Sequence, residues 1–301
     1  MKLSEVEDFI AIADTGSIRA AAKLRGVTPP AMTQSIARLE EKLHAPLVIR
    51  TTRGAQLSEY GVAFLARARL ISTEVRKARD EMAQMLGKEQ GQVTIGTSMT
   101  PTSTVIPRAV TEFRKAHPDV RLNIIAGMFH EHLPRIRAGS MDLALGPVPA
   151  TGLGADFEVE KLFNNDLVLT ARRGNPYATA KSLSDLAHAE WILGGPVNHG
   201  PGAAVIDMFE QNGFSAPRVM VQSSSLSVMQ ALLLDSDMIC ALPRQMVTSE
   251  PLCRHVVAIE VSEKMPTYTV SLFRRAGSPL SPVADHLATL VRREAHHWIL
   301  G

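Results

Sequence analysis

The 301-residue sequence has little cysteine and no long apolar run, and each shortage excludes a class of protein. Its two cysteines, Cys240 and Cys253, cannot form the disulfide framework of a small secreted domain. No stretch of eighteen apolar residues occurs, so no membrane-spanning helix is expected. The first eight residues are charged and lack the apolar core of a secretory signal, which predicts a cytoplasmic protein with no membrane partner.

Catalytic and metal-binding motifs are missing as well. Gly200-Pro201-Gly202 is rich in glycine, but no Lys-Ser/Thr pair follows it, so it is not a phosphate-binding loop. No Gly-x-Ser-x-Gly nucleophile elbow is present. The adjacent His296 and His297 would point apart on a helix, and no histidine pair has a cysteine or carboxylate at a metal-binding spacing. We therefore expect no enzyme, no metal and no cofactor.

The net charge of +2 is too small to indicate a nucleic-acid partner, but the charges are unevenly distributed. Residues 1–90 hold 14 basic and 11 acidic side chains, and residues 91–301 hold 18 and 19. Four of the early acids lie within the first helical segment, and most of the basic residues come after that segment. This separation allows a basic face that binds phosphates. By itself, the charge favours an ordinary mixed surface over such a face.

Two short helices are predicted near the amino terminus. Apolar residues recur at helical spacing over residues 3–13, and Thr15-Gly16 ends this segment. Ser17 can cap a second helix over residues 18–24, in which three consecutive alanines allow close packing.

A third helix is predicted from Pro29 to about Leu43, with Thr28 as its cap. Its core stripe is Met32, Ile36, Leu39 and Leu43, and the opposite side carries Pro30, Gln34 and Ala37, with Thr33 and Arg38 on the flanks. Short side chains on that side let a helix enter the major groove of DNA, where Thr33 and Gln34 can bond to base edges.

A strand, a basic turn and a second strand are predicted over residues 47–57. Such a wing would bring Arg50, Thr52 and Arg53 near phosphates or the minor groove of DNA. A plain three-helix bundle with a hairpin explains the same spacing, so the pattern alone leaves both interpretations open.

Three stretches resemble the DNA-binding end of LysR-type transcriptional regulators. They are Ser17–Ala22, Thr28–Leu43 and Pro46–Gly54, the last followed by Leu57–Gly61, and they match in order and spacing. With this resemblance, we assign DNA contact to Arg19, Thr28, Pro30, Thr33, Gln34, Arg38, Arg50, Thr52 and Arg53. The resemblance also implies a homotetramer built as a dimer of dimers, promoter DNA and a small co-inducer as partners, and RNA polymerase as a further candidate partner.

The sequence departs from the family pattern at three positions. Pro29 stands where the family usually has glutamine, which removes one habitual DNA contact. His44 replaces a usual glycine after the reading helix, and Val48 replaces a usual phenylalanine before the wing. We interpret the last two as packing changes.

A long helix is predicted over residues 62–86, which contain neither proline nor glycine. Apolar residues alternate at spacings of four and three, which is the seam of a helix pair: Phe64, Ala68, Ile71, Val75, Ala78, Met82 and Met85. The seam favours dimerisation, and a single helix packed on its own domain is the alternative.

The rest of the chain alternates strand-like and helix-like segments, among them a helix expected over residues 132–138 and a strand expected over residues 166–170, which predicts mostly parallel sheets covered by helices. The expected fold class is therefore α/β, with an all-α winged helix-turn-helix in front, a linker helix, and a two-subdomain sensor like periplasmic binding proteins. The predicted boundaries are 1–59 for the winged helix-turn-helix, 60–90 for the linker and 91–301 for the sensor, with subdomain I at 92–163 and 268–301 and subdomain II at 164–267.

A cleft between the subdomains is the expected effector site. Thr100 can cap a helix that starts at Pro101, and Gly200-Pro201-Gly202 opens another, so two helix amino termini would favour an anion. The resemblance places nine residues near the pocket: Ser98, Met99, Thr100, Phe129, His130, His199, Gly200, Pro201 and Gly202. Some stretches are similar to a subgroup that regulates toluenesulfonate degradation, so an aromatic carboxylate or sulfonate is the expected effector class.

Two further alternatives are a redox sensor and a solute-binding protein. Some family members switch through cysteines, but Cys240 lies in the apolar run Met238–Leu242, which predicts a buried, unreactive thiol. The predicted DNA-binding segment and the missing secretory signal argue against a solute-binding protein.

Overall fold

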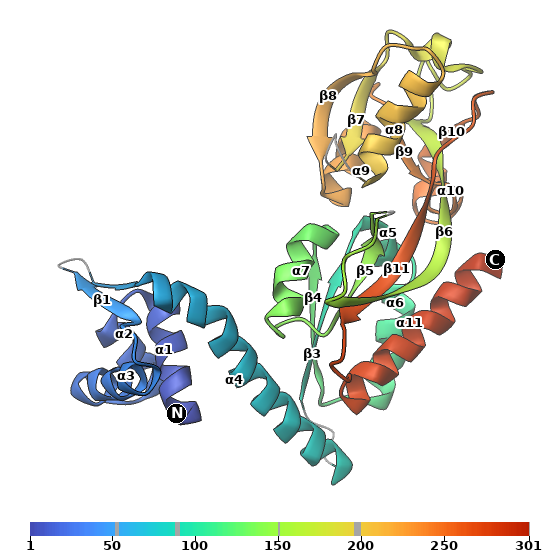
Figure 1. Ribbon diagram of the computed structural model, residues 1–301. Coiled ribbons are helices and arrows are strands. Elements are labelled where there is room, and N and C mark those ends of the chain that lie inside the picture. Colours follow the sequence, from blue (N-terminus) through green and yellow to red (C-terminus); the bar gives the residue numbers. More distant parts are fainter. Residues whose placement is uncertain (52–53, 88–90, 150, 196–199, 301) are drawn as a thin grey trace. The chain divides into compact units, whose positions relative to one another are not determined.

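The computed structural model describes the chain except residues 52–53, 88–90, 150, 196–199 and 301, and the side chains of residues 50, 299 and 300 (Figure 1). The chain divides into two compact units. The first comprises residues 1–91 with 134–141, and the second comprises residues 92–133 with 142–301. No helix among the described residues combines the length and apolarity that crossing a membrane requires.

The first unit contains the predicted three helices and wing. The elements are α1 (Leu3–Thr15), α2 (Ile18–Arg25), α3 (Pro29–Leu43), β1 (Val48–Thr51), β2 (Gly54–Leu57) and α4 (Glu59–Met85). The predicted caps are confirmed: Ser17 Oγ accepts from the Ala20 N–H at 3.4 Å and Thr28 Oγ1 accepts from the Ala31 N–H at 3.3 Å. The strands β1 and β2 pair antiparallel, so local sequence signals suffice for this unit.

His44 ends α3 in the left-handed region, with φ of 51°, and among the described residues it is the one non-glycine with positive φ. This conformation costs a residue with a Cβ about 1 kcal/mol or more, whereas glycine adopts it freely but loses more chain entropy on folding. His44→Gly is therefore expected to raise the free energy of unfolding by about 0.5 kcal/mol. Chemical denaturation of the full chain measures this change. His44→Ala, which keeps the Cβ, is the matched control and should give no gain; a loss of stability in His44→Gly would contradict the prediction.

The apolar seam of α4 serves two purposes, which corrects the prediction of one continuous dimer seam. Phe64 and Ala68 pack into the core of their own unit, where the rings of Phe9 and Phe64 lie 5.5 Å apart. Toward the other end of the helix, Met82 and Met85 are 53% and 72% exposed. The interpretation as a helix on its own domain is thus correct for the first part of α4, whereas the two methionines of its later part remain exposed.

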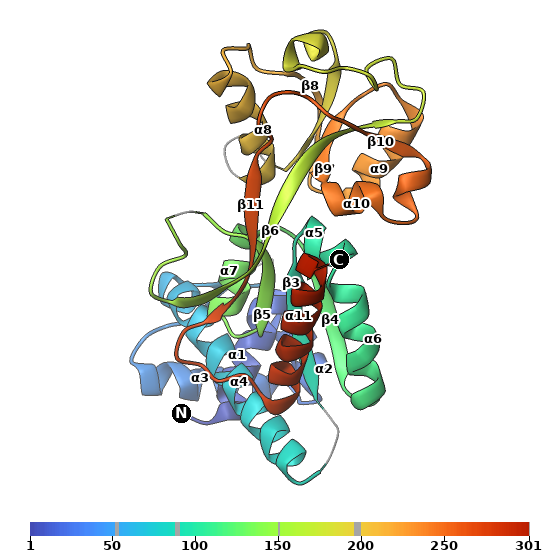
Figure 2. The ribbon, with the colours of Figure 1, turned by 90° about the vertical axis from the view of Figure 1, so that its right-hand side faces the viewer.

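The described residues of the second unit form nine strands: β3 (Gln92–Thr97), β4 (Arg121–Ala126), β5 (Leu143–Pro147), β6 (Phe157–Arg172), β7 (Glu190–Gly194), β8 (Arg218–Ser223), β9 (Cys240–Pro243), β10 (Val256–Ile259) and β11 (Thr267–Arg275). Its helices are α5 (Met99–Ser103), α6 (Ile106–Ala116), α8 (Gly200–Gln211), α9 (Leu226–Asp235), α10 (Arg244–Thr248) and α11 (Pro282–Leu300), and α7 (Phe129–Arg137) starts in this unit. These elements form two lobes joined by β6 and β11 (Figure 2). The first lobe contains β3, β4, β5, α5, α6 and α11, and the second contains β7 to β10 and α8 to α10.

The sheets are mixed, which corrects the prediction of mostly parallel sheets. Strand β3 pairs parallel with β4 and β5, and β7 pairs parallel with β8. The joining strand β11 pairs antiparallel with both β5 and β6, and β6 pairs antiparallel with β9 and β10. The antiparallel pairs arise because the chain leaves the first lobe along β6 and returns to it along β11, so these two strands run in opposite directions.

Several predicted elements differ from the observed ones in extent. Strand β6 is sixteen residues long, whereas only residues 166–170 were expected, and β10 was not expected at all. Helix α7 starts at Phe129 rather than His132, and Pro134 lies inside it as it does in the predicted helix. Each lobe has a core of its own, the first around Ile95 and Phe113 and the second around Trp191.

Candidate DNA-binding and effector sites

Helix α3 presents the predicted polar side to solvent. Met32, Ile36 and Leu39 are buried, whereas Pro30, Gln34, Ala37 and Arg38 are exposed and Thr33 is half-buried. Arg19, at the start of α2, is exposed, and so is Thr28, whose hydroxyl oxygen serves as the cap of α3. The structure therefore brings four predicted DNA contacts together on α3, and a fifth, Thr28, lies at its cap.

Two carboxylates of α1 fix the position of the other helices. Glu5 is only 1% exposed and accepts hydrogen bonds from Lys42 Nζ at 2.8 Å and from the backbone N–H of Lys2 at 2.8 Å. Asp8 accepts from Ser35 Oγ of α3 at 2.6 Å and from Arg25 Nε of α2 at 3.1 Å. These contacts of Glu5 and Asp8 thus fix the orientation of α3, and with it the direction in which its polar face points.

Arg38 has two possible partners, which qualifies its assignment to DNA. Its Nε lies 3.6 Å from Glu5 Oε1, while 49% of its side chain is exposed. The guanidinium is therefore already near a carboxylate, and phosphate would have to compete with Glu5 for it.

The pKa of Glu5 is lowered from 4.5 to about 2, first by the hydrogen bond from Lys42 and then by that from the Lys2 N–H. A carboxyl group with a lowered pKa contributes stability that is present above its unfolded pKa and is lost as the pH falls through its folded pKa. The first unit should therefore lose this stability between about pH 4.5 and pH 2. Glu5→Gln should lower the melting temperature at neutral pH and flatten its fall over this range. Thermal unfolding at a series of pH values measures both, with Glu41→Gln on the exposed side of α3 as control; an unchanged acid slope in Glu5→Gln would count against the assignment.

The wing rests on the turn between α1 and α2 and on the end of α3. Ala55 donates its N–H to the Gly16 carbonyl at 2.9 Å, and Glu40 Oε1 accepts from the N–H groups of Leu47 and Val48 at 2.7 and 3.0 Å. A Cβ on Gly54 would lie 2.5 Å from the Gly16 oxygen, so only glycine fits there. Of the predicted wing contacts, Thr52 and Arg53 and the side chain of Arg50 lie outside the described residues.

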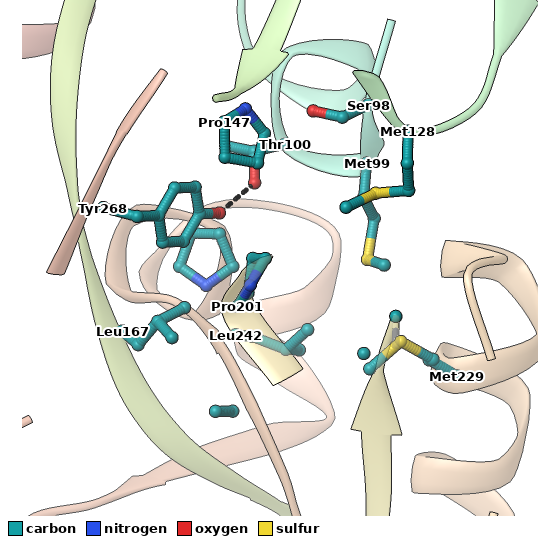
Figure 3. A pocket seen from close by; sticks show the side chains of 14 residues that line it. Ser98, Met99, Thr100, Met128, Pro147, Leu167, Pro201, Met229, Leu242 and Tyr268 are labelled. Carbon is teal, nitrogen blue, oxygen red and sulfur yellow. Dashed lines mark hydrogen bonds between the residues drawn. The ribbon is translucent and has the colours of Figure 1, made fainter. Parts of the chain in front are cut away.

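A cavity lies between the two lobes of the second unit (Figure 3). Four of the nine predicted effector residues line it: Ser98, Met99, Thr100 and Pro201. Sequence reasoning missed the others, which are Met128, Pro147, Leu167, Gly194, Gly195, Met229, Ala241, Leu242, Pro243 and Tyr268. Phe129 and His130 lie on α7 outside this lining, as do Gly200 and Gly202 on α8, and His199 lies outside the described residues.

A buried hydrogen-bond cluster borders this cavity. The Tyr268 hydroxyl of β11 lies 2.6 Å from Thr100 Oγ1 of α5 and accepts from Asn165 Nδ2 of β6 at 2.6 Å (Figure 3). Burial raises the pKa of Tyr268, so its hydroxyl is neutral near pH 7. The cluster ties a helix of the first lobe to both joining strands at the edge of the cavity.

The expected cap at Thr100 is wrong. Helix α5 begins at Met99 with Ser98 in the cap position, and it has only five residues, so Thr100 lies inside the helix and turns its hydroxyl to Tyr268 instead. Helix α8 does start at Gly200, as predicted. Of the two helix amino termini expected at the cleft, only that of α8 opens a helix of several turns.

The buried position predicted for Cys240 is confirmed. Its side chain is 0% exposed, and burial raises the pKa of the thiol to about 12. Cys253 is partly exposed in the short turn after α10. Because the thiolate is the reactive form, Cys240 has little redox reactivity in the folded chain.

Two protein-family models match the chain. The model of bacterial regulatory helix-turn-helix proteins of the lysR family covers residues 3–62, and that of the LysR substrate binding domain covers residues 86–296. Among similar proteins, the transcriptional regulator GalR of Pseudomonas putida is 28% identical over 95% of this chain and 72% of its own length. The regulator TdcA of Escherichia coli is 27% identical over 86% of this chain and 82% of its own length.

Solved structures share the fold over nearly the whole chain. CbnR, a LysR family transcriptional regulator, has a TM-score of 0.70 at 22% identity, covering 98% of this chain and 99% of its own, and it has also been solved with its target DNA. Full-length OxyR of Pseudomonas aeruginosa has a TM-score of 0.69 at 19% identity, covering 98% and 95%. The predicted fold class, a winged helix-turn-helix before a two-lobed α/β sensor, is confirmed.

Proposed function

The chain belongs to the LysR family of transcriptional regulators, and from this we propose that it binds promoter DNA through α3 and the wing and responds to a small organic anion held between the sensor lobes. Its relatives are transcriptional regulators, so the chain is a regulator and not an enzyme. The division into 1–59, 60–90 and 91–301 remains our proposal for its domains.

The observation that carries DNA binding is the two-sided character of α3. Three apolar residues and Ser35 bury one side, and the ion pairs of Glu5 hold that side in place. The other side presents Gln34 and Thr33 to solvent. The short side chains of Pro30 and Ala37 on the same side let the helix approach a partner closely. An anchored helix with short and amide side chains outward fits the major groove, where glutamine bonds to adenine edges.

Gln34→Ala is expected to relax sequence preference without abolishing binding. One good base contact contributes about tenfold or more in discrimination between bases. The measurement is competitive binding between a site selected from random DNA by the wild-type protein and its single-base variants. Arg53→Ala serves as the contrast, because a phosphate contact should weaken binding to all DNA alike; identical preferences in Gln34→Ala and the wild type would refute the reading role.

Two observations support an anion as the effector. The amino terminus of the twelve-residue helix α8 lies at the cavity, where Pro201 is part of the lining, and a helix amino terminus favours an anion. Ser98 lines the same cavity and is 5% exposed, and its hydroxyl has no hydrogen-bond partner among the described residues, so it can donate to a ligand oxygen. No described lining residue is cationic, so backbone and hydroxyl donors would hold the charge.

The effector class is tested by calorimetric titration of the full chain with aromatic carboxylates and sulfonates. Binding that also changes the footprint on promoter DNA would support the proposal. If none of these compounds bound, an aromatic anion would be rejected as the effector, while the DNA-binding role would be unaffected.

We further propose self-association as a dimer of dimers. The exposed Met82 and Met85 continue the seam of α4 beyond the part that packs on its own unit, and such a stripe is stable when a second helix covers it. RNA polymerase remains a candidate partner by resemblance to the family. Light scattering of the full chain, which separates monomer, dimer and tetramer, tests the assembly.

A further inference from the structure

Three methionines from separate elements meet along one side of the cavity (Figure 3). Met99 comes from α5, Met128 precedes α7 and Met229 comes from α9. Met128 is 7% exposed and Met229 only 1% exposed. Because methionine has three rotatable bonds and a polarizable sulfur, this side of the cavity can change shape at low cost.

The methyl groups of these methionines lie opposite glycine residues of the second lobe, which have no side chains. A Cβ built on Gly194 would lie 3.3 Å from Met229 Cε and 3.9 Å from Met99 Cε. A Cβ on Gly200 would lie 3.3 Å from Met128 Cε. The methionine side chains therefore occupy the space that a side chain at Gly194 or Gly200 would need.

The space left free is small. The cavity has a volume of about 30 Å³, enough for one or two water molecules. An apolar cavity that binds benzene measures about 150 Å³. A ring-sized ligand can enter the space beside Met229 and Gly194 only if methionine side chains leave their present positions, whereas the larger hollow of about 470 Å³ on the other side of Met99 and Met128 does not contain Met229 in its lining.

We propose that Met229, with Gly194 opposite, sets the size of the ligand this cavity accepts, by occupying the place of the ligand ring until the ring displaces it. The inference rests on the proposed function, because it takes the cavity as the effector site. It assigns the ligand one aromatic ring, since withdrawal of the thioethers frees space for one ring and leaves sulfur at the ring edge, a favourable contact. A fused second ring would meet the retained methionine.

The test measures binding of toluene-4-sulfonate and naphthalene-2-sulfonate to the full chain by calorimetry. The wild type should prefer the single ring. Met229→Ala should shift the affinity ratio toward naphthalene-2-sulfonate by about tenfold or more, as expected when a hydrophobic pocket gains room for several carbons. Gly194→Ala should weaken both ligands, and Gly194→Ala/Met229→Ala should recover binding, because the new Cβ meets the Met229 methyl group. Met220→Ala, at an exposed methionine of β8, is the matched control and should change neither affinity.

A second measurement guards against poor folding of the variants. In the wild type with methyl-¹³C methionine, toluene-4-sulfonate should shift the Met229 and Met128 methyl resonances through the ring current, while exposed Met220 stays unmoved. Binding of toluene-4-sulfonate with those resonances unchanged, or an unchanged affinity ratio in a folded Met229→Ala, overturns the inference alone. Failure of both sulfonates to bind the wild type and Met229→Ala overturns it together with the aromatic-anion effector.

Discussion

Gly61→Ala is expected to destabilise the DNA-binding unit by about 3 kcal/mol, at the upper end of the usual range for overpacking. A Cβ at Gly61, near the start of α4, would lie 2.1 Å from the carbonyl oxygen of Leu47. That oxygen cannot retreat easily, because it accepts the Ser58 N–H at 3.0 Å while Ser58 Oγ donates to the Pro46 carbonyl at 2.5 Å. Alanine would gain about 1 kcal/mol in helix propensity, which is smaller than the cost of the overlap.

Thermal and chemical unfolding of the full chain measure the effect of Gly61→Ala, with promoter binding as a second readout. Loss of binding should follow, because the same contact joins α4 to the base of the wing. Ala66→Val on the exposed side of α4 adds methyl groups without overlap and should change stability by about 0.5 kcal/mol or less. A Gly61→Ala variant as stable as the wild type would mean that helix and wing do not approach so closely.

Tyr268→Phe is expected to cost about 2 kcal/mol of stability in the sensor, because two buried polar groups lose their shared partner. Asn165 is 0% exposed and Thr100 is 4% exposed, so water cannot readily replace the lost hydroxyl. Since Tyr268 also lines the cavity, the variant should bind an aromatic sulfonate with altered affinity.

Calorimetric unfolding of Tyr268→Phe against the wild type gives the cost. Tyr177→Phe is the matched control in the second lobe, since no hydrogen bond of its hydroxyl is described, and it should lie within about 0.5 kcal/mol of the wild type. Equal losses in both variants would show that the cluster with Thr100 and Asn165 contributes no stability of its own.

The sequence was sufficient where structure is set by neighbouring residues. The caps at Ser17 and Thr28 and the core stripe of α3 depend on spacings of three and four, and all were predicted. The first part of β6 was missed because Glu158 and Glu160 make it look like a loop, although they lie on a strand with exposed positions.

The cavity was only partly predictable, because it depends on which distant segments meet. Ser98 and Thr100 were identified through the resemblance to the family, but nothing near Met229 or Tyr268 in the sequence indicates that they face the same space. The seam of α4 shows a related limit. A four-three spacing marks an apolar stripe, but it does not reveal that Phe64 packs on its own unit while Met85 remains exposed.

The two joining strands also determine the order in which the sensor can be completed during synthesis. The core residues of the second lobe come from one continuous stretch, between Leu167 and Ile259. The core of the first lobe includes Val270 and Leu272 of β11 and residues of α11 as late as Ala295. On the ribosome, the second lobe can therefore bury its core before the first lobe, although most of the first lobe is made earlier. Until α11 emerges, the apolar face of α6 that it will cover is open to chaperones.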